Sequence, residues 1–336
     1  MAKAILLGQS GGMTASAPDP ATALDRPALD ALCREASTWP LPAGGNTRTR
    51  WSALSRLGWR DLVLARLVEA HADAVAILAE LGGPPAAAGE RYGVWAAEMP
   101  SATVTAEGEG TEVRLSGRKA WCSGATLLTH ALVTARRGEE GVLCRVALDQ
   151  PGVVAEPDRW ASAGMQRADT RTVEFTAVAA TVVGEPGAYL TRPGFWVGGI
   201  GVAACWYGGA AHLAEPLWQR VSRHPDDVHA AAHLGGVDVL LGAARDTLRA
   251  AADAVDTYPK DDHARVARRV RATVADVAAA VATRVGRALG PAPLATDADH
   301  AQRVADLEVY VRQDHAERDL EVLGGDVAAS DPDWSL

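Results

Sequence analysis

Residues 115–124 of this 336-residue chain read Leu-Ser-Gly-Arg-Lys-Ala-Trp-Cys-Ser-Gly and are its most informative stretch. They lie within a segment, about residues 91–190, in which β-branched residues recur in short runs of alternating polarity. Turn residues such as Glu107-Gly108-Glu109-Gly110 separate the runs, and no helical pattern lies between them. Closely spaced short strands of this kind are typical of an antiparallel barrel or sandwich. We therefore predict a small β domain over residues 91–190.

The segments on either side have helical periodicity. Residues 20–90 predict an N-terminal helical domain, and residues 191–325 predict a C-terminal four-helix bundle whose last helix spans about 298–323. The fold class is therefore α+β. Residues 1–19 are expected to be a disordered tail or to lie outside the natural sequence, and residues 326–336 form a second tail. Two apolar stripes support the helices: Leu62, Ala65, Val68, Ala72, Val75 and Ala79, then Val266, Val270, Val274, Val277, Val281, Val285 and Leu289.

The composition excludes several classes of protein. There are 33 Lys and Arg against 42 Asp and Glu, a formal charge of -9, so the chain lacks the basic surface of a nucleic-acid binder. Its four cysteines are far apart in sequence, which argues against a disulfide framework or a metal site and favours a cytoplasmic protein. Residues 193–214 carry no formal charge, but glycines interrupt them, so they predict a buried helix and no membrane insertion.

The quoted stretch resembles the strand pair "L-x-G-x-K-x-W-x-[ST]-[NG]-[GA]" of the acyl-CoA dehydrogenase superfamily. Weaker similarities follow the family's order along nearly the whole chain. They are Gly93-Val94-Trp95-Ala96-Ala97-Glu98-Met99-Pro100, Gly164-Met165-Gln166-Arg167-Ala168, Val173-Glu174-Phe175 and Tyr310-Val311-Arg312-Gln313-Asp314-His315. The resemblance implies a flavoprotein whose β domain and helical bundle enclose FAD. It also implies oxidation of the α and β carbons of an acyl-CoA or another acyl thioester, in a homodimer or homotetramer.

The resemblance also assigns candidate cofactor-binding residues. A flavin ring needs an apolar or aromatic wall and hydrogen bonds at its polar edge. Trp121 and Trp95 are candidates for the wall and Ser123 for the hydrogen bond. The alternative interpretation of Trp121 is a core residue of the β domain, and we prefer the flavin role because of the flanking motif. Arg220 lies where the family binds the FAD diphosphate, but no Phe-Gly pair follows it, and the glycine-rich loops of the family are absent.

The catalytic base has several candidates on the last predicted helix. Spacing from Arg312 points to Glu321, with Glu317, Asp314 and His315 as alternatives. A carboxylate beside a flavin would have its pKa raised by desolvation, which suits proton abstraction. The structural alternative is a charged, solvated helix end.

Three functions remain open on sequence alone. The first, which we prefer, is an FAD-dependent dehydrogenase of acyl thioesters. The second is a flavin-dependent monooxygenase of the same fold, which needs no carboxylate base. The third is a non-catalytic, flavin-free relative that acts as an interaction partner.

Overall fold

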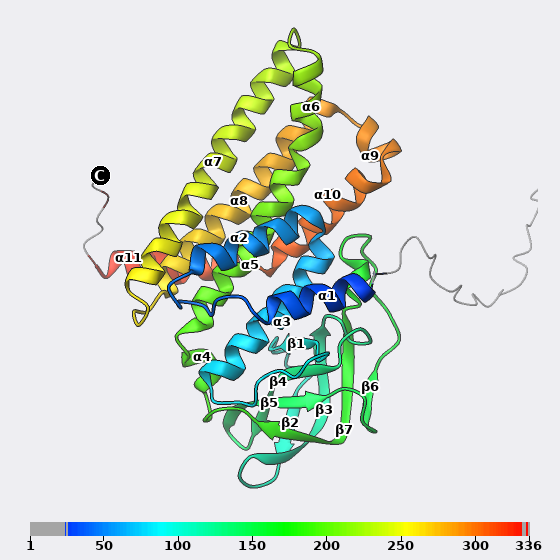
Figure 1. The fold of residues 1–336 in the computed structure, drawn as a ribbon, viewed down its shortest axis with the longest axis vertical. Helices are drawn as coiled ribbons and strands as arrows, with labels where there is room; N and C mark the ends of the chain where they lie inside the picture. Colours follow the sequence, from blue (N-terminus) through cyan, green and yellow to red (C-terminus); the bar gives the residue numbers. More distant parts are fainter. Residues whose placement is uncertain (1–23, 25, 331–333, 335–336) are drawn as a thin grey trace, which may run out of the picture.

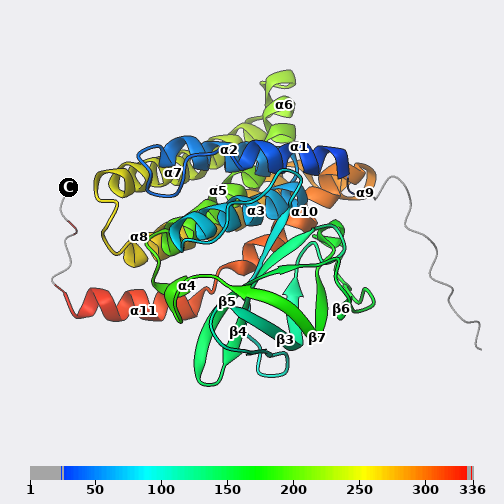
Figure 2. The same ribbon diagram turned by 60° about the horizontal axis from the view of Figure 1, so that its bottom comes forward.

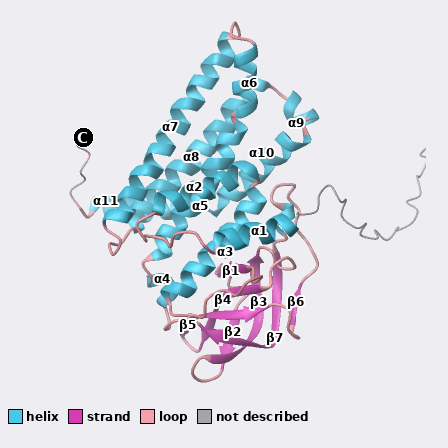
Figure 3. Ribbon diagram, viewed as in Figure 1, coloured by secondary structure: helices cyan, strands magenta, loops and turns pink. Residues whose placement is uncertain are grey.

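A computed structural model describes residues 24, 26–330 and 334, in which a β module lies at one end of a larger helical body (Figures 1 and 3). The predicted tail 1–19 lies outside the described residues. The helices before the β module are α1 (Arg26–Ala36), α2 (Thr47–Arg60) and α3 (Leu62–Glu80). Those after it are α4 (Ala188–Thr191), α5 (Gly194–Leu213), α6 (Glu215–Arg223), α7 (Val228–Thr257), α8 (Ala264–Leu289), α9 (Ala292–Thr296), α10 (Ala298–Tyr310) and α11 (Glu317–Ala328).

The β module is a closed barrel with its own apolar core. Its strands are β1 (Tyr92–Trp95), β2 (Val104–Glu107), β3 (Glu112–Cys122), β4 (His130–Arg137), β5 (Glu140–Ala147), β6 (Val153–Ala155) and β7 (Arg171–Val182). The ring runs β4-β2-β3-β7-β5 and closes where β5 pairs with β4. Most pairs are antiparallel, as predicted, but β1 and β2 run parallel to β4. The alternating residues Val113, Leu115, Val173, Phe175 and Val178 fill the interior.

Helix α3 connects the barrel to the helical body. Asp61 caps its N-terminus, with one carboxylate oxygen 2.8 Å from the backbone nitrogen of Val63 and 3.1 Å from that of Leu64. The helix contacts β1, α1, α2 and α5, and Figure 2 shows it between the barrel and the layer of α1 and α2. Because it is surrounded, most of its residues are buried, including polar ones.

The uncharged segment predicted to be buried is α5, which packs against α2 at backbone distance. A Cβ on Gly208 would lie 1.9 Å from the carbonyl oxygen of Ser55, and one on Gly58 would lie 2.1 Å from that of Cys205. Glycines therefore set the spacing of these two helices. Within the described part of the chain, no helix is long and apolar enough to cross a membrane.

The last predicted helix is interrupted. Helix α10 ends at Tyr310, a 3₁₀ turn spans Val311–Gln313, and α11 begins only at Glu317. Asp314 is extended and accepts a hydrogen bond from the backbone nitrogen of Ala316, which has a φ of 47°. This turn redirects the chain, so that α11 lies along α8 and extends to Ala328, beyond the boundary expected at residue 325.

Candidate functional site

A cavity of about 1110 Å³ lies between the barrel and the helices. Its lining comes from α3, from the barrel strands and the loop after β6, from α5, and from α8 and the α10–α11 connection. Among the candidate site residues of the sequence analysis, it brings together Trp121, Ser123 and His315. Trp95, Arg220, Asp314, Glu317 and Glu321 do not line it.

The barrel side of the cavity carries an exposed indole. Trp121 lies at the end of β3, beside a bulge, with a φ of 61°, a conformation that is costly for a residue with a side chain. Its side chain is 55% exposed and packs edge-on against Trp160, with the ring centroids 6.1 Å apart. Its indole nitrogen lies 3.1 Å from the sulfur of Met99. Trp121 is therefore a surface of the cavity and not a core residue of the barrel.

Ser123 follows two residues later and is held in place by its neighbours. Its hydroxyl lies 3.0 Å from that of Thr170, and both residues line the cavity. Trp95 is 1% exposed inside the barrel, and its indole nitrogen donates to the carbonyl oxygen of Ser123 at 3.1 Å. Trp95 thus contacts the site through Ser123, because the alternation of β1 turns its indole into the barrel core.

The helical side of the cavity is charged, which the sequence analysis did not predict. Helix α3 contributes Arg66, Glu69 and Asp73, and the segment before α5 contributes Arg192. Arg192 donates to Asp73 at 2.9 Å and to Glu80 at 2.8 Å. Arg66 lies 3.3 Å from Glu69, and burial raises the pKa of Glu69 to about 7 although Arg66 opposes the shift.

The sequence nevertheless contains a sign of this charged wall. The α3 sequence, Leu62 to Glu80, is almost continuously apolar, yet four charged residues interrupt it. A helix that is buried on all sides exposes no face to water, so its charged residues must pair or line a cavity.

The α10–α11 connection contributes the remaining candidate acid–base groups. His315 lines the cavity, and its Nδ1 lies 3.6 Å from a carboxylate oxygen of Asp319, which also lines it. Asp314 is half-buried behind them, 3.8 Å from Arg271. Glu317 and Glu321 lie exposed on α11. The break before α11 explains this, because it places the two glutamates on a helix that lies against α8.

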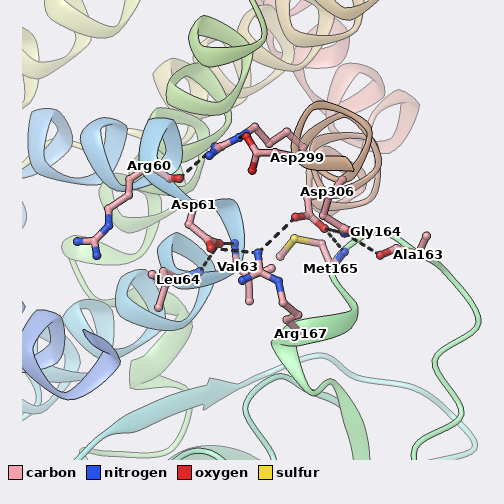
Figure 4. A network of polar contacts seen from close by, with 12 residues as sticks. Arg60, Asp61, Val63, Leu64, Ala163, Gly164, Met165, Arg167, Asp299 and Asp306 are labelled. Atoms are coloured by element: carbon pink, nitrogen blue, oxygen red, sulfur yellow. Dashed lines mark hydrogen bonds and ion pairs between the residues drawn. The ribbon is translucent and has the colours of Figure 1, made fainter. Parts of the chain in front are cut away.

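A polar network fixes the loop that forms one edge of the cavity (Figure 4). Asp306 of α10 accepts a hydrogen bond from the backbone nitrogen of Met165 at 2.5 Å, and Gln302 donates to both Asp306 and the carbonyl oxygen of Ala163. Arg167 joins this cluster to α3, since it lies 3.0 Å from Asp61 and 3.9 Å from Asp306.

Arg220 lies away from the cavity. It is on α6, and its guanidinium forms two hydrogen bonds with Asp227, the residue that caps α7. A contact between Arg220 and a flavin diphosphate stays a prediction. The described residues contain no group of three or more His, Cys, Asp or Glu side chains placed to hold a metal ion.

Comparisons with known proteins define the fold. Residues 88–178 match the family model described as acyl-CoA dehydrogenase, middle domain. Butyryl-CoA dehydrogenase from Megasphaera elsdenii superposes with a TM-score of 0.81 at 17% identity, over 92% of each chain. The chain therefore carries an acyl-CoA dehydrogenase middle domain within an acyl-CoA dehydrogenase fold, which confirms the resemblance seen in the sequence.

Two other structures with this fold were determined with FMN. KijD3, in complex with FMN and dTDP-3-amino-2,3,6-trideoxy-4-keto-3-methyl-D-glucose, gives a TM-score of 0.79 at 18% identity, over 94% of this chain and 90% of the other. TdsC from Paenibacillus sp. A11-2, in complex with FMN and indole, gives 0.78 at 18% identity, over 93% of each chain. A search of curated protein sequences finds no significant match.

The residues of the cavity fit a flavin ring. Trp121 and Trp160 supply an aromatic wall, Ser123 and Thr170 supply hydroxyl groups, and the volume accommodates a tricyclic ring beside a substrate. Four guanidinium groups also line the cavity, those of Arg66, Arg192, Arg271 and Arg312, and of these Arg192 is paired with two carboxylates.

Proposed function

We propose that this chain is a flavin-dependent oxidoreductase that binds the flavin ring against Trp121 and Ser123 and oxidises the α and β carbons of an acyl thioester. The observation that carries the proposal is the composition of one cavity, which combines an exposed indole and hydroxyl groups with an acid–base side chain, His315. When bound, the flavin supplies the acceptor for a hydride. The chain itself must hold the substrate and accept a proton.

His315 is the residue we propose as the proton acceptor. Neutral imidazole accepts the α proton on one ring nitrogen, while the carboxylate of Asp319, 3.6 Å from Nδ1, stabilises the resulting cation. Such contacts shorten when substrate closes a site.

The cofactor is FAD in the dehydrogenase proposal. Since Arg220 does not reach this cavity, the diphosphate would be held by residues from a second subunit, in the homodimer or homotetramer that the resemblance implies. FMN, with one phosphate, is the alternative, and it is the flavin found in the KijD3 and TdsC structures.

The absorption spectrum after reconstitution tests this proposal. The purified protein is incubated with FAD or FMN, freed of unbound flavin and titrated without oxygen with butyryl-CoA. We expect a retained flavin band that butyryl-CoA bleaches. Replacing His315 by Asn should slow the bleaching at least 100-fold, whereas the same change at His229, which is exposed on α7, should not. If neither flavin is retained, the chain is the flavin-free relative instead.

A second candidate is a flavin-dependent monooxygenase, favoured by the position of Glu317 and Glu321 outside the cavity. A monooxygenase removes no α proton from a thioester and therefore needs neither glutamate as a base. Its flavin would be reduced by a separate donor and reoxidised by oxygen. This function predicts a retained flavin that no acyl thioester bleaches, together with oxygen consumption once the flavin has been reduced chemically.

A further inference from the structure

Arg66 and Glu69 form an incompletely bonded pair in the helical wall of the cavity. Their side chains are 13% and 9% exposed, and the single contact between them is 3.3 Å long. Within the described residues, that contact is the only hydrogen bond either side chain makes. The second oxygen of Glu69 and two nitrogens of Arg66, including the buried Nε, therefore lack partners.

The neighbouring ion pair is built differently. Both terminal nitrogens of Arg192 bond to carboxylates, one to Asp73 and one to Glu80. The terminal nitrogens of Arg192 are thus occupied by the protein, although its Nε, like that of Arg66, is buried without a partner. Glu69 and a terminal nitrogen of Arg66 have bonding capacity left.

Hydrogen-bonding atoms without partners at the wall of a cavity indicate where a polar group of a ligand can bind. A half-satisfied buried polar pair is unfavourable, and a group that donates to Glu69 while accepting from Arg66 completes it. The pair has no net charge when both members are ionised, so a neutral group suits it. Hydroxyl and primary amide groups both donate and accept. An unsubstituted methylene chain would remove water from the pair and form no hydrogen bond with it.

We propose that Arg66 and Glu69 recognise a hydroxyl or amide substituent on the acyl group of the substrate, so that the site selects polar acyl thioesters over plain alkyl ones. This inference rests on the proposed function, since it concerns the same cavity. The raised pKa of Glu69 agrees with it, because a carboxyl group that is partly protonated near neutral pH can donate as well as accept.

The test compares butyryl-CoA with 4-hydroxybutyryl-CoA. The rate of flavin bleaching at low thioester concentration should be at least tenfold higher for the hydroxylated compound. In the double variant Arg66→Met/Glu69→Leu, which removes both charges together, the preference should fall at least tenfold. Glu317→Gln, on the exposed side of α11, is the control and should keep the wild-type preference.

A second measurement does not depend on turnover. The hydroxylated thioester should raise the melting temperature of the flavin-stripped wild-type protein more than butyryl-CoA does. Equal rates and equal melting shifts in the wild type would overturn the inference. So would a double variant that keeps its flavin but loses the same factor with both thioesters, which would make the pair catalytic. A wild type that retains flavin but is bleached by neither compound overturns the proposed function, and the inference with it.

Discussion

The carboxylate of Asp306 lies 2.5 Å from the backbone nitrogen of Met165, although the two residues are 141 positions apart. Met165 has a φ of 58°, a left-handed conformation that side chains make costly. Asp306, itself 2% exposed, satisfies the buried N–H that this conformation directs into the protein. One hydrogen bond thus holds the loop at the cavity edge in a shape it would not adopt alone.

Replacing Asp306 by Ala should destabilise the protein by about 2–3 kcal/mol, because the buried N–H of Met165 loses its partner. Urea unfolding measures this change. Asp299 on the same helix provides the control, since its side chain is 72% exposed and, among the described residues, pairs only with Arg303. Asp299→Ala should cost no more than about 0.5 kcal/mol. Equal costs for the two variants would mean that Asp306 does not support the loop.

The buried Glu69 should make the protein less stable as pH rises. Its pKa is about 7 in the folded chain against 4.5 in the reference state, so the folded protein binds more protons between these values. The contribution of Glu69 to the unfolding free energy is fully present below pH 4.5. About 3 kcal/mol of it is lost as pH rises to 7. Glu69→Gln removes this titration. The difference in unfolding free energy between the variant and the wild type should therefore shift in favour of the variant when pH is raised from 4.5 to 8. Urea unfolding at the two pH values checks it.

His71 should act in the opposite direction. Its Nδ1 accepts from the backbone nitrogen of Tyr92 and its Nε2 contacts Ser37, while burial lowers its pKa to about 4 from 6.5. The folded protein therefore binds fewer protons, and stability is lost as pH falls from 6.5 to 4, again by about 3 kcal/mol. The effects of Glu69 and His71 nearly cancel in the wild type. In His71→Gln only the Glu69 contribution remains, so the unfolding free energy should fall as pH rises from 4.5 to 6.5. An equal slope in wild type and variant would mean that the pKa of His71 is not lowered by burial.

Trp121 should contribute to flavin affinity. Trp121→Ala removes the exposed aromatic wall and is expected to weaken the binding of added FAD or FMN at least tenfold, measured by fluorescence quenching of the flavin. Trp218 on α6 is almost equally exposed, 56% against 55%, and does not line the cavity. Trp218→Ala should leave flavin affinity unchanged. A loss shared by both variants would point to general destabilisation.

Gly208 should tolerate no side chain. Alanine there would place its Cβ 1.9 Å from the carbonyl oxygen of Ser55, which separates α2 from α5 at a cost of about 3 kcal/mol or more. Gly235 on α7 offers the matched control, because a Cβ there meets no atom within 4 Å. Gly235→Ala should stabilise the protein by up to about 1 kcal/mol through helix propensity. Thermal unfolding of both variants distinguishes the two environments.

The fold was predictable because its signals are local. The period-two runs between residues 91 and 190 and the valine stripe of α8 report which faces are buried, and those patterns need no knowledge of distant contacts. The break at Asp314–Ala316 was not predicted, because no glycine or proline marks it in the sequence. It depends on a turn with a positive φ at Ala316.

The site was only partly predictable. Trp121 and Ser123 carry a sequence motif, and the cavity brings them together with His315. Arg66 and Glu69, by contrast, were not predicted as site residues. Their place in the cavity wall depends on the position of α3 between the barrel and α5, which no local pattern encodes. Helical spacing placed Leu62, Ala65 and Val68 in the core but could not say that the far side of the helix borders a cavity.

The cavity is assembled from segments that span almost the whole chain, from Arg66 on α3 to Asp319 on α11. On the ribosome, the barrel and α3 emerge long before α10 and α11, so a nascent chain lacks the part of the cavity wall that these two helices supply. The cavity is therefore complete only once α11 has been synthesised, and a chain shortened before α10 would lack the residues that close it.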